Sequence, residues 1–458
     1  MHETGQALVF GLFVMFAGLL SLFFLFNAGQ LTAEKVKLVN TADAVAYSAG
    51  LLEARSLNFD AYGNRALIAN EIAIAQMVSL SSWAQYAGEL GTNLPLQFAG
   101  PTCYEPMPYY GKSMLLTYGL CYLLYYGGWA YADAADPITT ATEAVAVASE
   151  ALKTAIKTSQ TVLHNGALLA ARQSMMSRVA DANYHGDGSV SIDLVPLEDN
   201  FTAMIQKYVK NGKSGDERAR LGNLVKDAAS RDSFVQNRSW TDTSLIPTCI
   251  GINGIFFDRL KRRGGTELLG YDEWKAMDTM SIHRAYIPSH SLECEYGEAP
   301  IGSGAQAAVN AAQSGGSYGG SMSDNPGASS MASSSDWNFY TGIPEFYDLS
   351  DSALKKLDPR VRLSIRLTRN KVETRTTETK PDLQLGGNLA VYNADQASNV
   401  IAATSSSEVY FERPEPRSDG KKELASLFNP FWHVHLISTG DAAKTQAAAL
   451  QGAAIIPD

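Results

Sequence analysis

The feature that most constrains this chain is an uncharged apolar run from Leu8 to Phe26, in which the only hydroxyl group belongs to Ser21. A helix of about 20 apolar residues crosses the roughly 30 Å hydrocarbon layer of a bilayer. A cleavable secretion signal would instead carry a basic segment before a shorter apolar core. The residues before the run, MHETG, contain no Lys or Arg. We therefore predict an uncleaved transmembrane anchor over residues 1–29, with cleavage after the Asn-Ala-Gly at 27–29 as the alternative.

The residues after the anchor predict one long helix. No proline occurs between Met1 and Leu94, so nothing forces the helix to stop at the membrane surface. If it reaches about Tyr86, it is on the order of 120 Å long at 1.5 Å per residue. Five apolar residues alternate at spacings of four and three: Leu38, Ala42, Val45, Ala49 and Leu52. This heptad-like seam predicts close helix packing, with the neighbouring Glu53 facing solvent.

A second helix, rich in Ala and Val, is predicted from Pro137 to about Ala182. Proline suits the first turn of a helix, and Thr140 with Glu143 matches a capping box. We expect this helix to pack antiparallel along the first one. Residues 30–185 would then form a long helical hairpin whose connecting loop is rich in Pro, Tyr and Gly.

Two stretches near the N-terminus resemble a known family. The sequence GQALVFGLFVMF, followed by NTADAVAYSAGLLEAR, resembles the N-terminal region of TadG-like proteins of tight-adherence (Flp) pilus systems. Near the C-terminus, EVYFERP and LFNPFWHVHL more weakly resemble segments of large proteobacterial members. The resemblance implies an envelope-anchored accessory or minor-pilin-like role without assigned catalysis. It also implies other pilus or envelope subunits as partners.

The four cysteines are Cys103, Cys121, Cys249 and Cys294, and none belongs to a Cys-x-x-Cys pair. Their spacing fits no zinc signature. Behind a membrane-targeting segment, an even number of cysteines favours disulfides in an oxidising compartment. Three pairings are open, and we favour neighbours in sequence, Cys103 with Cys121 and Cys249 with Cys294. Unpaired buried thiols are the alternative.

The rest of the chain predicts a mixed head, so the fold class is α+β. Residues 186–300 combine helical and strand patterns, and residues 301–336 form a stretch rich in Gly, Ser and Ala that we interpret as a flexible linker or loop. Residues 337–458 alternate with period two, which favours antiparallel strands, and end in an Ala-rich helix at about 441–454.

Charge and motifs exclude several functions. The net charge of −10 argues against nucleic acid as a partner, because phosphate binding needs clustered Lys and Arg. One basic run, residues 258–265, is interpreted as a solvated surface or turn. Fragments of penicillin-enzyme motifs occur at 323–325 and 352–355, but in reversed order and without Lys-Thr-Gly. We therefore expect no catalytic residues, no cofactor and no enzyme activity.

One alternative involves a metal. Asp348, Ser350 and Ser352 match the Asp-x-Ser-x-Ser loop of von Willebrand A domains, in which a carboxylate and two hydroxyls suit Mg²⁺. Such a loop should end an apolar parallel strand, and the residues around it predict antiparallel structure instead. Ser350 as the N-cap of a short helix is the favoured interpretation. His433 and His435 on one face of a strand are interpreted as ordinary histidines.

Taken together, the sequence predicts a non-enzymatic structural or assembly component of a tight-adherence pilus or related filament. The expected location is the bacterial inner membrane, in a single pass, with the C-terminal part periplasmic or at the cell surface. Lys35 and Lys37 follow the span and nothing basic precedes it, so charge alone does not orient the chain. The expected partners are the membrane and other subunits through the N-terminal helix, and an oligomer is compatible with this role. A surface adhesin or sensor with a metal at Asp348 is the second hypothesis, and a periplasmic hydrolase the third.

Overall fold

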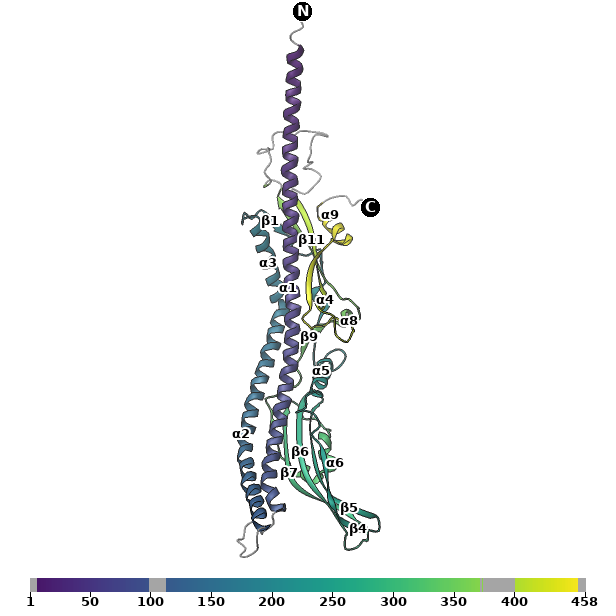
Figure 1. Cartoon of the computed structure of the whole chain (residues 1–458). Helices are drawn as coiled ribbons and strands as arrows, with labels where there is room; N and C mark the ends of the chain where they lie inside the picture. The colour runs from purple at the N-terminus through teal and green to yellow at the C-terminus, as the bar shows by residue number, and fades with distance from the viewer. Residues whose placement is uncertain (1–5, 99–112, 371–372, 374–399, 452–458) are drawn as a thin grey trace, which may run out of the picture. The chain divides into compact units, whose positions relative to one another are not determined.

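The computed structural model describes residues 6–98, 113–370, 373 and 400–451 (Figure 1). The chain forms two compact units, each assembled from separate stretches of sequence. Unit 1 combines Met1–Tyr62, Thr161–Gln206 and Tyr347–Asp458, and unit 2 combines Gly63–Gln160 and Lys207–Phe346. Each unit contains parts of long helices and a sheet of its own, so the expected α+β class is confirmed.

The long helices come first in the chain. Helix α1 (Gln6–Phe98) is followed by α2 (Ser113–Val162), a π-type turn η2 (Leu163–Ala167) and α3 (Leu168–Asn183). The helix kinks within η2, where Asn165 and Gly166 leave helical φ/ψ. In unit 1, Asp60 contacts His164 and Glu53 contacts Arg172. In unit 2, Glu71 contacts Lys153, and the backbones of Gly91 and Gly128 lie against each other. Partner numbers rise as the α1 numbers fall, so the predicted antiparallel hairpin is confirmed within each unit.

The start predicted for the second helix was wrong. Pro137 lies inside α2, which already begins at Ser113. The hydroxyl of Thr140 donates a hydrogen bond to the Asp136 carbonyl one turn earlier rather than capping a helix start. A proline inside a helix removes one backbone hydrogen bond, so the residues on either side must be held by tertiary contacts. A local sequence pattern does not reveal those contacts.

Unit 1 contains an antiparallel sheet in the order β1-β10-β11-β12. Its strands are β1 (Val190–Ile192), β10 (Val361–Asn370), β11 (Val400–Phe411) and β12 (Trp432–Ile437), and β2 (Glu198–Asp199) also pairs with β10. Three short helices accompany the sheet, namely α4 (Phe201–Met204), α8 (Asp351–Leu354) and α9 (Asp441–Leu450). The predicted antiparallel strands and C-terminal helix of the last third are therefore confirmed.

The predicted seam on α1 is the centre of the core of unit 1. Leu38, Ala42, Val45 and Ala49 are fully buried, and Leu52 is half-buried. The first four pack against α3 and the sheet, through residues that include Met176, Ala180, Leu363, Ile365 and Leu367. A Cβ atom on Gly50 would lie 2.7 Å from Ser407 Oγ and 2.8 Å from Val434 Cγ2. The seam therefore packs against strands as closely as against a helix.

Unit 2 contains a second sheet, in the order β4-β5-β6-β7-β8. The first four strands are antiparallel neighbours: β4 (Trp240–Gly251), β5 (Gly254–Leu269), β6 (Glu273–Tyr286) and β7 (Glu295–Val309). Strand β8 (Ser334–Trp337) runs parallel to β7. The remaining elements of unit 2 are α5 (Ala219–Ala229), η3 (Tyr318–Gly320), α6 (Ser321–Asp324) and α7 (Pro326–Met331). The short strands β3 (Ile205–Tyr208) and β9 (Phe346–Leu349) pair with each other and include residues assigned to both units.

The interpretation of residues 301–336 as a flexible linker or loop was wrong for most of this stretch. Its first part belongs to β7, residues 310–317 form a loop, and most of the remainder forms η3, α6, α7 and β8. A Cβ atom on Gly304 would lie 2.2 Å from the Ser82 carbonyl oxygen and 2.5 Å from the Tyr86 nitrogen, both in the backbone of α1. The small residues therefore permit a helix to lie directly on the strand, which composition alone does not distinguish from a linker.

The basic run at 258–265 was also misinterpreted. It lies within β5, and the Arg262 side chain is buried. The guanidinium of Arg262 pairs with Asp278 at 2.7 Å, and that of Arg263 pairs with Asp324 at 2.6 Å. These charges are neutralised inside unit 2 rather than solvated at a turn.

Candidate functional site on the N-terminal helix

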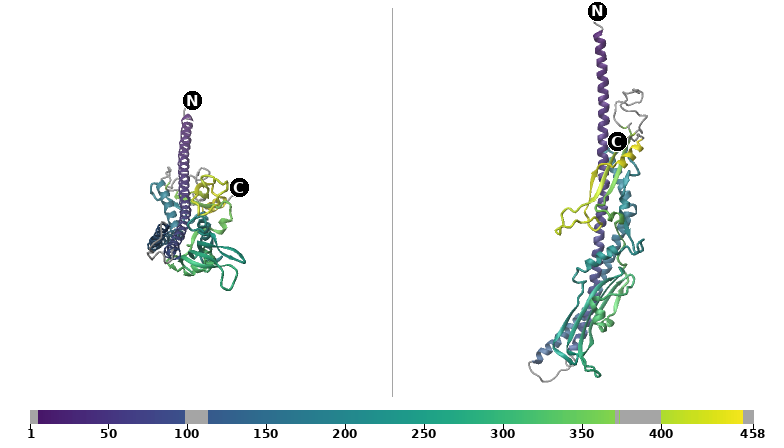
Figure 2. Two further views of the ribbon diagram at one scale, coloured as in Figure 1. Left: turned by 60° about the horizontal axis from the view of Figure 1, so that its bottom comes forward. Right: turned by 90° about the vertical axis from the view of Figure 1, so that its right-hand side faces the viewer.

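The first part of α1 is an exposed apolar surface. Its large side chains from Leu8 to Phe26 are exposed, from 37% at Phe23 to 74% at Leu8. This part of the helix stands clear of the other described elements in every view (Figures 1 and 2). Among the described helices, α1 alone is long and apolar enough to cross a membrane, judged by length and composition. We refer to Leu8–Phe26 as the apolar span.

The same helix changes environment within about three turns. Leu31 and Val39 already pack against the core of unit 1, and Leu38 is fully buried. Between the span and the seam, Glu34 pairs with Arg369, and the Lys35 ammonium donates a hydrogen bond to a backbone carbonyl of β11. Unit 1 is therefore tied to α1 directly after the span.

This stretch of helix is also where a comparison with known families finds a match. Residues 5–55 match the Tad family model, described as putative Flp pilus-assembly TadE/G-like. The match begins just before the apolar span and ends after Leu52, so it includes the whole seam. The resemblance of the N-terminal region to TadG-like proteins is confirmed. The match supports involvement in a Flp or tight-adherence pilus system, with pilus-system partners and a membrane association.

No curated protein and no solved structure matches the chain. The Tad match covers residues 5–55 alone. Beyond residue 55, the roles of individual residues follow from the geometry of the structure.

Buried charges line α1 within unit 1, where sequence reasoning placed an exposed face. Glu53 was expected to face solvent, but it is fully buried and its carboxylate pairs with Arg172. The other guanidinium nitrogen of Arg172 pairs with Asp199. About two turns farther along α1, the Asp60 carboxylate lies 2.7 Å from Nε2 of His164. The sequence did contain a signal for this ion pair, because Glu53 lies directly beside the seam. When both sides of an apolar seam are covered, an acid next to it is buried and requires a partner of opposite charge.

A second set of buried charges lies in unit 2. The ammonium of Lys153 pairs with Glu71 of α1 and, at 2.8 Å, with Glu150. The Glu71 carboxylate also accepts hydrogen bonds from Trp274 Nε1 and Tyr340 OH, each at 2.9 Å. Burial is the main reason that the pKa of the Tyr340 phenol lies well above its usual value. These bonds join both helices to the sheet, which suits a structural role rather than acid–base chemistry at a surface.

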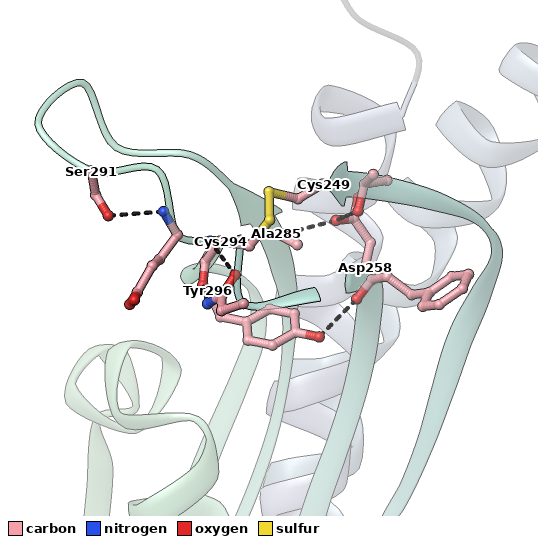
Figure 3. The surroundings of a disulfide bond; sticks show 10 residues. Cys249, Asp258, Ala285, Ser291, Cys294 and Tyr296 are labelled. Carbon is pink, nitrogen blue, oxygen red and sulfur yellow. Dashed lines mark hydrogen bonds between the residues drawn. A yellow bond between two sulfur atoms is a disulfide. The ribbon is translucent and has the colours of Figure 1, made fainter. Parts of the chain in front are cut away.

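The disulfide Cys249–Cys294 is confirmed (Figure 3). It joins the end of β4 to the segment before β7, and both cysteines are buried beside Ala285, Phe256 and Tyr296. The other expected pair falls outside the description: Cys103 lies outside the described residues, as does the side chain of Cys121.

The Asp348 constellation has a structural explanation. Asp348 is fully buried at the end of β9, and its Oδ1 accepts backbone hydrogen bonds from Leu349 at 2.8 Å and Leu427 at 2.9 Å. Ser350 occupies the N-cap position of α8, and its hydroxyl donates to the Ala203 carbonyl at 2.9 Å instead of capping the helix. The Ser352 hydroxyl lies 3.1 Å from the Ser350 hydroxyl. Within the described residues, no group of three or more His, Cys, Asp or Glu side chains could hold a metal ion.

The two histidines of β12 are likewise accounted for by local contacts. Nε2 of His433 lies 3.1 Å from the Glu412 carbonyl oxygen, and Nε2 of His435 lies 3.5 Å from Glu408. Both rings pack against Tyr410 of the neighbouring strand. Their arrangement is that of cross-strand pairs on one face of a sheet.

Proposed function

We propose that the protein is a membrane-anchored, non-enzymatic structural or assembly component of a tight-adherence pilus, similar in role to a minor pilin. The observation that carries the proposal is the division of α1 into an exposed apolar span and a buried seam, both inside the stretch that matches the pilus-assembly family. A helix of this kind anchors the folded extracytoplasmic part of the chain rigidly to the membrane.

The disulfide supports the proposed location. Disulfides form and persist in oxidising compartments and are rare in the cytoplasm. With Cys249–Cys294 in unit 2, the C-terminal part is assigned to the periplasm or cell surface, and the apolar span to a single pass through the inner membrane. The short N-terminus before the span would then lie in the cytoplasm.

Partner subunits are proposed to bind through the N-terminal helix. The apolar span offers Gly11 and Gly18, and Gly29 follows it; at all three an added Cβ would have no neighbour within 4 Å. A neighbouring transmembrane helix can approach closely at such positions. The metal-dependent adhesin has no comparable support, because Oδ1 of Asp348 and the hydroxyl of Ser350 already bind the backbone of unit 1.

The test combines fractionation with partner capture in the native bacterium. Full-length protein should stay in the membrane pellet after alkaline carbonate extraction, and it should co-purify with subunits of the pilus machinery after mild cross-linking. A deletion strain should lose filaments and regain them with the full chain. Recovery of the chain in the soluble fraction without residues 1–28 would identify a cleaved signal instead. Normal filaments in the deletion strain would disprove the pilus role.

A further inference from the structure

The end of the β4–β5 hairpin in unit 2, with the β6–β7 connection bonded to it through Ile252 N and Leu292 O at 3.0 Å, carries a cluster of aliphatic side chains that face solvent. These residues, here called the aliphatic tip, are between 60 and 97% exposed: Leu245, Ile246, Ile250, Ile252, Ile255 and Leu292. No charged residue occurs between Asp242 and Asp258. In Figure 1 this hairpin projects from the sheet of unit 2. Contiguous exposed apolar patches are uncommon on monomeric proteins and mark contacts with other proteins or with membranes.

Strand pairing explains why these side chains point outward. The β4–β5 register shifts between Thr243 and Pro247, so that Leu245 and Ile246 lie in a bulge outside the regular ladder. Beyond the bulge, Ile250 pairs with Ile255, and Cys249 pairs with Phe256. Directly opposed residues of an antiparallel pair share a face, so the isoleucines lie opposite the face that buries the disulfide.

The tip is held in place by specific bonds. Asn253 in the turn accepts a hydrogen bond from the Cys294 nitrogen at 2.9 Å and donates one to its carbonyl at 3.0 Å. The Asp258 carboxylate accepts hydrogen bonds from the Thr248 hydroxyl and the Ala285 nitrogen, each at 2.8 Å. With the disulfide, these bonds fix the hairpin to its neighbours (Figure 3). The aliphatic side chains are therefore presented at little further cost in conformational entropy.

We propose that the aliphatic tip inserts into a lipid bilayer. A bilayer receives a projecting apolar end without a matching groove, and its hydrated interface accommodates the polar backbone of a turn. Between Asp242 and Asp258 the hairpin has no charged side chain that would have to leave water. Glu293, the exposed neighbour of Leu292, would remain at the hydrated interface. This inference stands apart from the pilus role, because it depends on unit 2 and not on the apolar span.

A second copy of the chain fits the tip less well. The described residues form a pocket of about 630 Å³ in unit 1, beside β11 and β12. Its lining includes Arg360, Arg413, Arg417 and Lys422, whose charges an aliphatic side chain would have to desolvate. Packing of one tip on another is a second way for copies to associate, and the experiment separates it from lipid binding.

The experiment uses full-length protein in amphipol, which covers the apolar span, mixed with vesicles of phosphatidylethanolamine and phosphatidylglycerol. Protein that sediments with the vesicles is quantified for the wild type, for Leu245→Ser with Ile246→Ser, and for Leu292→Ser. Because burying one Leu or Ile stabilises binding substantially, each serine should weaken vesicle binding by about tenfold. Met331→Ser removes another exposed apolar side chain of unit 2, away from the tip, and should bind like the wild type.

Retention of the Cys249–Cys294 disulfide, checked by non-reducing mass spectrometry, shows that each variant is folded at the tip. Equal vesicle binding by the wild type and the tip variants, or no binding by any of them, would overturn the proposal. So would self-association that disappears in the tip variants while no vesicles are bound, because the occupant would then be a second copy.

Discussion

Glu53 and Arg172 form a buried ion pair in unit 1, and Arg172 also pairs with Asp199 nearer the surface. Burial raises the pKa of Glu53 to about 7, although the positive charge of Arg172 opposes the rise. Burial alone would lower the pKa of Arg172, but its hydrogen bonds to Asp199 and Glu53 outweigh burial and hold that pKa above the usual value. Arg172 is thus the group that limits the rise in the pKa of Glu53.

Replacing Arg172 with methionine should destabilise unit 1 in a pH-dependent way. Glu53 would lose its cation while remaining buried, which costs roughly 3–5 kcal/mol when one member of a buried pair is removed. Its pKa would rise further, so between the ordinary value of 4.5 and the raised value the folded state binds more protons than the unfolded state. The free energy of unfolding, relative to wild type, should therefore fall more at pH 8 than at pH 5.

Denaturant unfolding at both pH values provides the measurement. Adding Glu53→Gln to the Arg172→Met variant removes the titrating group and should abolish the extra loss at pH 8. If the single variant loses the same stability at both pH values, Glu53 does not depend on Arg172 for its charge.

The seam element gives a sharper comparison, because α1 provides alanines on both kinds of surface. Ala49 is fully buried in unit 1, whereas Ala69 on the same helix is exposed. Ala49→Glu places a charge against α3 and the sheet and should cost several kcal/mol, or roughly 3–5 by analogy with other unpaired buried charges. Ala69→Glu should change stability by less than about 0.5 kcal/mol.

Membrane-bound abundance and filament assembly serve as readouts for this pair. Loss of both with Ala49→Glu, and neither with Ala69→Glu, is the expected result. Equal tolerance of the two glutamates would mean that the seam is not packed in the assembled protein.

The π-helical turn between α2 and α3 keeps the hairpin in phase. In unit 1, the acids Glu53 and Asp60 are seven positions apart (60 − 53), but their partners His164 and Arg172 are eight apart (172 − 164). In unit 2, Asn64 and Glu71 are seven apart (71 − 64), and so are their partners Lys153 and Gln160 (160 − 153). The extra residue coincides with η2, at Leu163–Ala167. One inserted residue rotates the following helix by about 100°, which brings Arg172 to face α1.

Deletion of Asn165 tests this phase argument. The π turn would become an ordinary helical turn, Arg172 would rotate away from Glu53, and the loss should approach that of breaking the buried pair, roughly 3–5 kcal/mol. Asn165→Ala keeps the length of the turn at an exposed position and should be nearly neutral. Thermal unfolding of both variants decides the matter, and similar melting temperatures would show that η2 has no such function.

How far these elements could be predicted from sequence depended on whether the signal was local. The apolar span, the absence of proline and the four-three spacing are local patterns, and each led to the correct helix and to a buried seam. Gly304, Pro137 and Glu53 were misjudged because their roles depend on chain segments distant in sequence: the α1 backbone on Gly304, and Arg172 on Glu53. Composition indicates the size and charge of a side chain, but not which distant segment packs against it.

At the scale of the whole molecule, one helix supplies both the apolar span and the seam on which unit 1 is built. The seam begins at Leu38, so a chain lacking residues 1–28 keeps every residue of the core that packs on α1. Membrane insertion and folding of the two units are therefore separable properties of this chain. The disulfide reports which side of the membrane the folded part occupies.

Oxidation of Cys249 and Cys294 should follow membrane insertion. In the full-length chain, alkylation of living cells followed by non-reducing mass spectrometry should find this pair as a disulfide. The disulfide joins cysteines that are 45 residues apart, and in the chain-entropy account it stabilises the fold by about 4 kcal/mol. The chain without residues 1–28 should remain in the reducing cytoplasm, carry two free thiols at these positions and unfold at a lower denaturant concentration. Free thiols at Cys249 and Cys294 in the full-length protein would instead place unit 2 in the cytoplasm and reverse the proposed topology.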